Sequence, residues 1–171
     1  EAVPLDVKLV VVGERMLYYL LDALDPDMDR LFKVMADFDD QIDRTEAQED
    51  AYTDLIATTI DDRDLQPFDR SAVARVLEHS LRLVSDTEKL SARVADIRDL
   101  MTEADHWAQD DQATTVTDAH VQQAIDAQVR RAGRLRDRVH ESIEREKVYI
   151  DTQGTTIGQI NGLSYLEMGG V

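Results

Sequence analysis

The chain has 171 residues, of which 43% are apolar, and a formal net charge of −17. This length suits one ordinary domain and is too short for two large ones. The absence of cysteine excludes disulfide bonds and thiolate metal sites. No apolar run reaches the roughly 18 residues of a transmembrane helix, and the opening Glu1–Pro4 lacks the features of a signal peptide. We therefore expect a cytoplasmic protein without membrane contacts.

The negative charge is concentrated in one part of the chain. Residues 22–64 contain fifteen acidic side chains and four basic ones. Such a surface repels nucleic acid, whose binding depends on neutralising phosphates, so nucleic acid is not an expected partner. Solubility or adaptation to salt accounts for the charge without any specific ligand.

The first element predicted is a strand. Leu5–Val12 is almost entirely apolar and β-branched, and Gly13 and a helical pattern over 14–24 follow it at once. This order is typical of a buried parallel strand in an α/β sheet. No further strand pattern follows for more than a hundred residues, so we expect its neighbours upstream of Glu1.

A short helix should open at Asp25 and Pro26, with Asp25 as N-cap and Pro26 in the first helical position. Its apolar positions are Leu31, Val34 and Met35. Residues 36–40 favour a short extended piece, and 41–48 a polar loop or hinge. We place a domain boundary near Thr45.

The middle of the chain predicts three helices. Residues 46–63 place Tyr52, Leu55, Ile56, Thr59 and Ile60 on one face. Pro67–Ala95 then predicts a helix, a break at residues 85–87 and a second helix, with Asp69 or Ser71 capping the first. The first buries Val73, Val76, Leu77, Leu81 and Val84. The second, capped by Asp86 or Thr87 and ending near Gln109, buries Leu90, Val94, Ile97, Met101 and Ala104.

The C-terminal third predicts one long helix and then β structure. Thr117 and Asp118 cap a helix whose apolar spacing continues past Arg130 to Ile143, and the excess length suggests a stalk between domains. From Lys147 onward, two β-branched runs around a glycine turn predict a hairpin, and residues 163–166 a third strand.

Several polar groups have the spacing of sites. Glu103 and His106, and Asp137 and His140, stand three residues apart, as in di-iron bundles. The facing helices lack matching inward glutamates, so exposed helical histidines are the simpler interpretation, also for His79 and His120. A di-iron bundle remains a rival hypothesis. The basic run over 130–138 is better explained as a solvated helix surface than as an RNA patch.

The position of Arg93 requires a specific explanation. It lies near the start of the predicted second helix, where the helix dipole disfavours a cation unless an anion is close. That anion is either an acidic side chain, Glu88 or Asp96, or a bound phosphate. The residues alone leave both options open.

The segments in order resemble one known family. They are a strand ending in VVVG, a DPDMDRLFKV helix, PFDRSAVARVLEHSLRL, EKLSARVADI, VTDAHVQQAID and IDTQGTTIGQINGLSYLEMGG. Together they look like the bacterial Lon-related, LonB-like ATP-dependent proteases of the peptidase S16 type. The resemblance implies a mostly α fold, an AAA+ lid-type helical bundle, with one strand of an α/β subdomain before it and a short β segment after it. The implied parts are residues 1–45 (end of the α/β subdomain), 46–130 (lid), 131–146 (connecting helix) and 147–171 (start of the protease domain).

The resemblance also implies roles. Arg93 would be the sensor-2 arginine, and Arg30 or Lys33 a cation that acts on the nucleotide of the neighbouring subunit. ATP and Mg²⁺ would be the cofactors, bound mainly by residues outside this chain, which lacks a GxxxxGK[ST] loop. The partners would be copies of itself in a hexameric ring, and protein substrates. The Ser–Lys protease pair would also lie outside the chain, so the chain alone should be inactive. A non-enzymatic acidic helical adaptor is the alternative.

Overall fold

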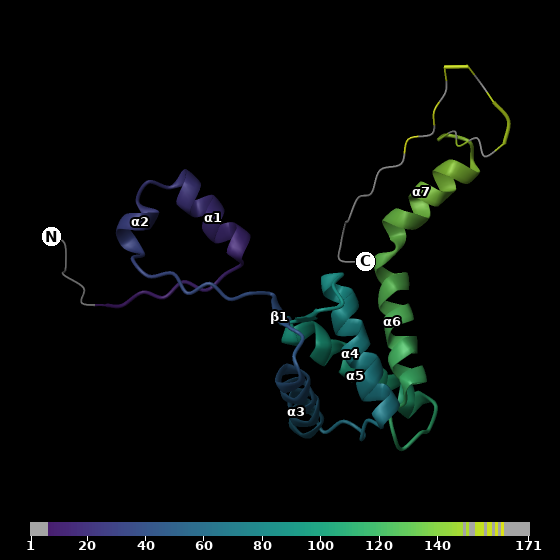
Figure 1. The fold of residues 1–171 in the computed structure, drawn as a ribbon, viewed down its shortest axis with the longest axis horizontal. Coiled ribbons are helices and arrows are strands. Elements are labelled where there is room, and N and C mark those ends of the chain that lie inside the picture. The colour runs from purple at the N-terminus through teal and green to yellow at the C-terminus, as the bar shows by residue number, and fades with distance from the viewer. Residues whose placement is uncertain are drawn as a thin grey trace. The chain divides into compact units, whose positions relative to one another are not determined.

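The computed structural model describes residues 7–148, 150, 153–155, 157, 158, 160 and 162. It divides into two compact units, Glu1–Asp39 and Asp40–Val171 (Figure 1). The described residues form seven helices and two short antiparallel strands, so the mostly helical fold predicted from the sequence is confirmed. None of the described helices is long and apolar enough to cross a bilayer.

The first unit contains α1 (Arg15–Leu24) and α2 (Met28–Leu31). Helix α1 confirms the helix predicted over 14–24. Its N-terminal end is tied to the segment after α2, because Arg15 Nε lies 3.0 Å from Asp37 Oδ1 and the Tyr19 hydroxyl donates to Asp37 Oδ2 over 3.1 Å.

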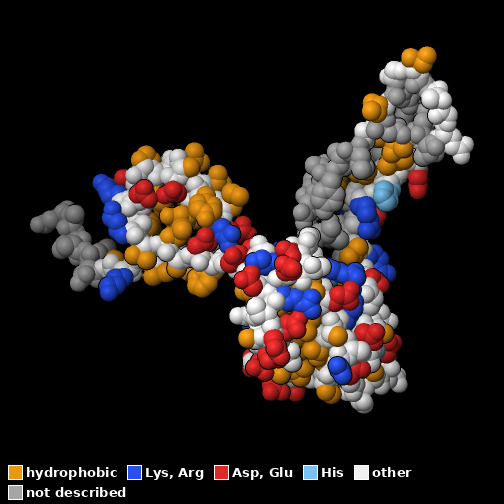
Figure 2. Space-filling view, viewed as in Figure 1, with side chains coloured by type: hydrophobic (Ala, Val, Ile, Leu, Met, Phe, Trp, Pro, Cys, Tyr) orange, Lys and Arg blue, Asp and Glu red, His pale blue; other side chains and the backbone are white. Residues whose placement is uncertain are grey.

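The strand predicted over Leu5–Val12 does not form within its described part. Residues 7–14 have no regular structure, and the apolar side chains there are exposed, up to 92% for Val12. A parallel strand exists only through hydrogen bonds to neighbours, and no other described segment pairs with this one. Figure 2 shows the resulting orange apolar areas on this unit.

The short helix also begins later than predicted. Its N-cap is Asp27 rather than Asp25, and Asp25 instead accepts a hydrogen bond from the Asp27 N–H over 3.0 Å. Val34 and Met35 were expected on its apolar face, but the helix ends at Leu31 and both side chains are exposed. The Asx turn at Asp25 therefore delays the helix by two residues.

The second unit opens with α3 (Glu46–Arg63) and α4 (Arg70–Val84), both confirmed from the sequence. Thr45 caps α3 by accepting from the Gln48 N–H over 3.3 Å, and Asp69 caps α4 by accepting from the Ala72 N–H over 2.8 Å. The C-cap residues that follow the two helices are Asp64 and Ser85, both in the left-handed conformation with φ 53°.

Two three-residue strands connect distant parts of this unit. Strand β1 (Gln41–Asp43) pairs antiparallel with β2 (Lys89–Ser91), with Ile42 opposite Leu90. The Ala92 N–H extends the pairing by donating to the Asp40 carbonyl over 2.8 Å. The sequence predictions of a loop over 41–48 and a helix through Leu90 are therefore wrong at these positions. Three residues are too few to display a strand period of two.

Helix α5 (Val94–Asp110) runs through the centre of the core and packs mainly against α6 (Asp118–Ala132). The buried faces predicted for α3, α4 and α5 are largely confirmed. The fully buried large side chains include Ile56, Val76, Leu90, Ile97, Leu100, Met101, Val116 and Val121. Ala104, Ala108 and Ala124 are also completely buried, which lets the helix backbones approach closely.

The long C-terminal helix is broken at Gly133. It divides into α6 and α7 (Arg134–Glu144), and α7 buries no residue. Gly133 has φ −71° and ψ −1°, and a Cβ added there would lie 3.0 Å from the Val129 carbonyl oxygen. The predicted continuity past Arg130 thus fails at a single residue without a side chain.

No described residue after Glu144 belongs to a strand. Part of the predicted hairpin, including Tyr149 and Asp151, lies outside the described residues, as does the predicted strand over 163–166. Gly154 and Gly158 have φ of 87° and 83°, which fits the glycine turn expected in this segment.

Candidate functional site at the start of helix α5

Arg93 is the N-cap residue of α5, so the helix cap predicted at Asp86 or Thr87 is wrong: residues 89–91 form β2, and the helix begins only after Arg93. Its φ of −78° and ψ of 73° lie outside the helical region, so the chain turns here from β2 into α5. Its N–H donates to Ser91 Oγ over 3.2 Å. The N-terminus of a helix carries partial positive charge, which the guanidinium reinforces, although the Val94 and Asp96 N–H groups already donate to the Ala92 and Arg93 carbonyls over 2.9 and 3.1 Å. The combination is a point where an anion is favoured.

Three buried polar side chains hold this turn in place. The Tyr52 hydroxyl donates to the Ser91 carbonyl over 3.1 Å, and the Ser91 N–H donates to Ser80 Oγ over 2.9 Å. All three residues are buried. Burial raises the pKa of the Tyr52 hydroxyl, which therefore stays protonated and able to donate. Tyr52 from α3 and Ser80 from α4 thus meet Ser91 of β2, which is itself hydrogen-bonded to Arg93.

The Arg93 side chain is paired with Asp96, one turn along α5. Arg93 Nε lies 2.9 Å from Asp96 Oδ2, and the two side chains are 63% and 38% exposed. Of the two acidic partners considered from the sequence, the structure selects Asp96 over Glu88. An exposed ion pair of this kind contributes about 0–1 kcal/mol. The guanidinium is therefore held, yet it remains accessible to a competing anion.

His79 on α4 lies close to the same region and differs from the expected exposed histidine. Its side chain is half-buried. Burial, followed by the nearby charges of Arg75 and Arg82, lowers its pKa, while Asp96 and Glu78 act in the opposite direction. His79 is consequently neutral at pH 7 and adds no charge beside Asp96.

The other two cations named from the sequence lie in the first unit. Arg30 is exposed, and its guanidinium lies 3.3 Å from Asp27. Lys33 follows α2 and is also exposed. Arg93 belongs to the second unit. Their exposure leaves both side chains accessible to a phosphate of another molecule.

Glu103, one of the possible metal ligands, has another partner. Both its carboxylate oxygens lie 2.7 Å from the Arg131 guanidinium, which joins α5 to α6. Hydrogen bonding from Arg131 lowers the pKa of Glu103. Within the described part of the chain, no three His, Asp or Glu residues cluster as a metal site would require. The geometry gives the di-iron hypothesis no support.

His120 is a structural residue that the sequence analysis placed wrongly on the surface. It is only 7% exposed, and its Nδ1 accepts a hydrogen bond from the Thr117 N–H over 3.0 Å. Thr117 and His120 together form a capping box at the start of α6. The Thr117 cap predicted from the sequence is confirmed, and a histidine three residues later was the overlooked signal.

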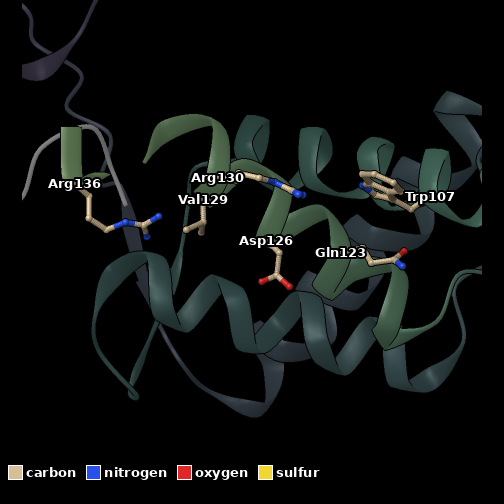
Figure 3. A pocket seen from close by; sticks show the side chains of 6 residues that line it. All are labelled: Trp107, Gln123, Asp126, Val129, Arg130 and Arg136. Atoms are coloured by element: carbon tan, nitrogen blue, oxygen red, sulfur yellow. The ribbon is translucent and has the colours of Figure 1, made fainter. Parts of the chain in front are cut away.

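An open groove of about 540 Å³ lies beside α6 (Figure 3). Asp126, Val129 and Arg130 project into it from α6, with Trp107 from α5 and Arg136 from α7. It contains part of the basic run over 130–138. Arg131 of that run pairs with Glu103, and Arg136 lies 3.4 Å from Asp137. The run is partly neutralised, in keeping with a solvated helix surface.

Two protein-family models match this chain. Residues 67–131 match the AAA+ ATPase lid domain of archaeal LonB, and residues 1–39 match the LonB-like AAA domain. The chain belongs to the LonB-type family. The resemblance stated from the sequence is thereby confirmed. A search of curated proteins gave no match.

In this LonB-type chain, the lid match spans α4, β2, α5 and α6 and contains Arg93. Helix α3 precedes the matched range, yet its Tyr52 and Ile56 belong to the same core. The LonB-like AAA match covers α1 and α2 and includes Arg30 and Lys33. The chain therefore joins the end of an AAA module to its lid.

Proposed function

We propose that this chain is the lid-containing part of an ATP-dependent LonB-type serine protease, in which Arg93 contacts the phosphates of bound ATP. The observation that carries the proposal is the position of Arg93, an accessible cation at the N-terminus of a helix within the LonB lid match. A guanidinium forms charge-assisted hydrogen bonds with phosphate oxygens.

Such a contact would couple the nucleotide to the lid. Arg93 continues directly from a turn that Tyr52, Ser80 and Ser91 hold rigidly. When a phosphate attracts the guanidinium, the force is transmitted through this turn to the helices of the lid core. Loss of the γ-phosphate ends that attraction and frees the lid to move. The proposed result is a lid movement that drives unfolding and degradation of protein substrates.

ATP is bound mainly by residues outside this chain in this proposal. The described residues contain no cluster of carboxylates suited to Mg²⁺, so we assign no Mg²⁺ ligand here. Residues 1–45 would complete the α/β subdomain, 46–130 form the lid, 131–146 connect it, and 147–171 begin the protease domain. This chain by itself should neither hydrolyse ATP nor cleave peptides.

The proposed assembly is a cytoplasmic homo-oligomeric ring, a hexamer. In a ring, each nucleotide lies close to the next subunit, and a cation from that subunit can stabilise the developing phosphate charge. Arg30 and Lys33 are the proposed candidates because both are exposed in the segment that matches the LonB-like AAA domain. Protein substrates are the proposed partners, and nucleic acid is not.

Arg93→Ala in the complete ATP-dependent protein tests the proposal. A hydrogen bond to a charged group contributes about 1.5–3 kcal/mol, which corresponds to roughly ten- to a hundredfold in affinity or rate. We expect ATP-stimulated proteolysis to fall by this factor, with ATP-independent cleavage of a short peptide unchanged. Arg98→Ala removes a cation from the same helix and should leave both activities unchanged. Equal activity of Arg93→Ala and the wild type would refute the phosphate contact.

A further inference from the structure

We infer that Asp96 competes with nucleotide phosphate for Arg93 and thereby lowers the affinity of the lid for ATP. This inference rests on the proposed phosphate contact of Arg93. Asp96 acts here as a positioning residue, which holds the guanidinium when no phosphate is present and releases it when one arrives.

The pair is built into the first turn of α5. The Asp96 N–H donates to the Arg93 carbonyl over 3.1 Å, which fixes the two residues relative to each other. The Asp96 carboxylate then lies 2.9 Å from Arg93 Nε. Among the described residues, Asp96 is the one acidic group within ion-pair distance of Arg93. Any second anion that binds Arg93 must therefore compete with this carboxylate.

Other groups around Asp96 do not replace Arg93 as its counter-ion. Its negative charge reaches Tyr52 on α3 and His79 on α4, acting to raise both pKa values. Tyr52 is uncharged, and the lowered pKa of His79 leaves that side chain neutral at pH 7. The nearby Arg75 donates instead to the Gln122 side chain, over 2.8 and 2.9 Å. Asp96 thus holds Arg93 by a single charged contact.

The exposure of the pair sets the size of the effect. Ion pairs accessible to water are weak and are screened by salt. Because the ion pair is weak, a phosphate can displace Asp96 from Arg93. The pair still lowers the affinity of Arg93 for other anions. Removal of the Asp96 charge should raise ATP affinity by about two- to fivefold at low salt, and by less at high salt.

The test is a double-mutant cycle in the complete protein, with the dissociation constant for Mg-ATP measured under non-hydrolysing conditions. The variants are Asp96→Asn, Arg93→Ala and the double variant. We expect Asp96→Asn to bind ATP about two- to fivefold more tightly and Arg93→Ala more weakly. In the Arg93→Ala background, Asp96→Asn should change nothing, because the group it competes for is gone.

Two controls separate charge removal from competition. Asp99→Asn removes the same charge one turn along α5, where Asp99 lies 3.7 Å from Arg63, and should leave ATP affinity unchanged. Asp96→Glu keeps the charge and should bind ATP as the wild type does. If Asp96→Asn does not fold, Asp96→Ser removes the charge and keeps a side chain favoured near helix starts.

Each outcome decides a different point. If Arg93→Ala weakens ATP binding but Asp96→Asn does not strengthen it, the competition is refuted and the proposed function stands. If Asp96→Asn strengthens binding equally with and without Arg93, the effect is general electrostatics and the competition is again refuted. If Arg93→Ala leaves ATP binding unchanged, the proposed phosphate contact fails, and the role of Asp96 fails with it.

Discussion

At the scale of single residues, the site depends on buried polar atoms that no sequence pattern indicated. Arg93 could be recognised as an unusual cation at a helix start, and Asp96 as one of two possible partners. Ser91 could not be recognised, because it lies in a strand of three residues that the apolar spacing assigned to a helix. The contact of Tyr52 with the Ser91 carbonyl joins residues far apart in the chain.

Tyr52→Phe should destabilise the second unit. It removes the donor to the buried Ser91 carbonyl and leaves that acceptor unsatisfied, which costs about 1–3 kcal/mol. Urea denaturation monitored by circular dichroism measures the change in unfolding free energy. Tyr18→Phe, in the first unit, is the matched control and should leave the urea midpoint of the second unit unchanged. An equal midpoint for Tyr52→Phe and wild type would contradict the structural role.

His79 should make stability depend on pH. Its pKa is lowered in the folded state, so the unfolded chain, with a pKa near 6.5, takes up the proton first. Stability is therefore complete above pH 6.5 and declines as the pH falls below that value. Thermal unfolding between pH 7.5 and 5.5 should show a smaller loss for His79→Gln than for wild type. His106→Gln, at an exposed position, should retain the wild-type loss; identical slopes for all three proteins would rule out His79 as the source.

At the scale of elements, length and capping decided what could be predicted. Helices α3 and α4 have several turns of apolar spacing and a side-chain cap, and both were predicted with the observed positions. Strands β1 and β2 are each three residues long, and they lie far apart in the sequence and pair only in the folded chain. The apolar segment 7–12 has every local feature of a strand, but hydrogen-bonded neighbours decide whether a strand exists.

Gly133→Ala should join α6 and α7. A Cβ at residue 133 would lie 2.7 Å from the flexible Arg136 guanidinium and 3.0 Å from the Val129 carbonyl oxygen, so alanine requires a small shift of both. Alanine favours the helix by about 1 kcal/mol over glycine. We expect a stronger helical circular dichroism signal at 222 nm, because residue 133 then continues the helix from α6 into α7. Gly162→Ala, where a Cβ meets nothing within 4 Å, should not change the spectrum. An unchanged signal for Gly133→Ala would locate the cause of the break elsewhere.

At the scale of the whole molecule, charge is the dominant feature. The net charge is −17, and much of it falls on the segment that includes α3. Figure 2 shows acidic groups spread over the visible surface of the second unit, with basic groups between them. Mutual repulsion of this size destabilises a compact state. Composition alone was enough to predict this property, since it does not depend on the fold.

Salt should therefore stabilise the chain. Raising NaCl from 50 mM to 500 mM reduces the screening length from more than 10 Å to a few ångströms and weakens the repulsion. We expect the melting temperature to rise by several degrees, and KCl to act equally, because screening does not distinguish the two cations. A melting temperature that falls with salt would mean that the surface ion pairs outweigh the repulsion.

The pairing of β1 with β2 has a mechanical consequence. The Asp40 carbonyl, at the first residue of the second unit, accepts a hydrogen bond from the Ala92 N–H, and Ala92 directly precedes Arg93. Tension along the connection from the first unit therefore acts on this bond and on the antiparallel pairing of β1 and β2 that follows it. Because Ala92 and Arg93 are consecutive residues, a force on the chain at Asp40 acts one residue away from Arg93.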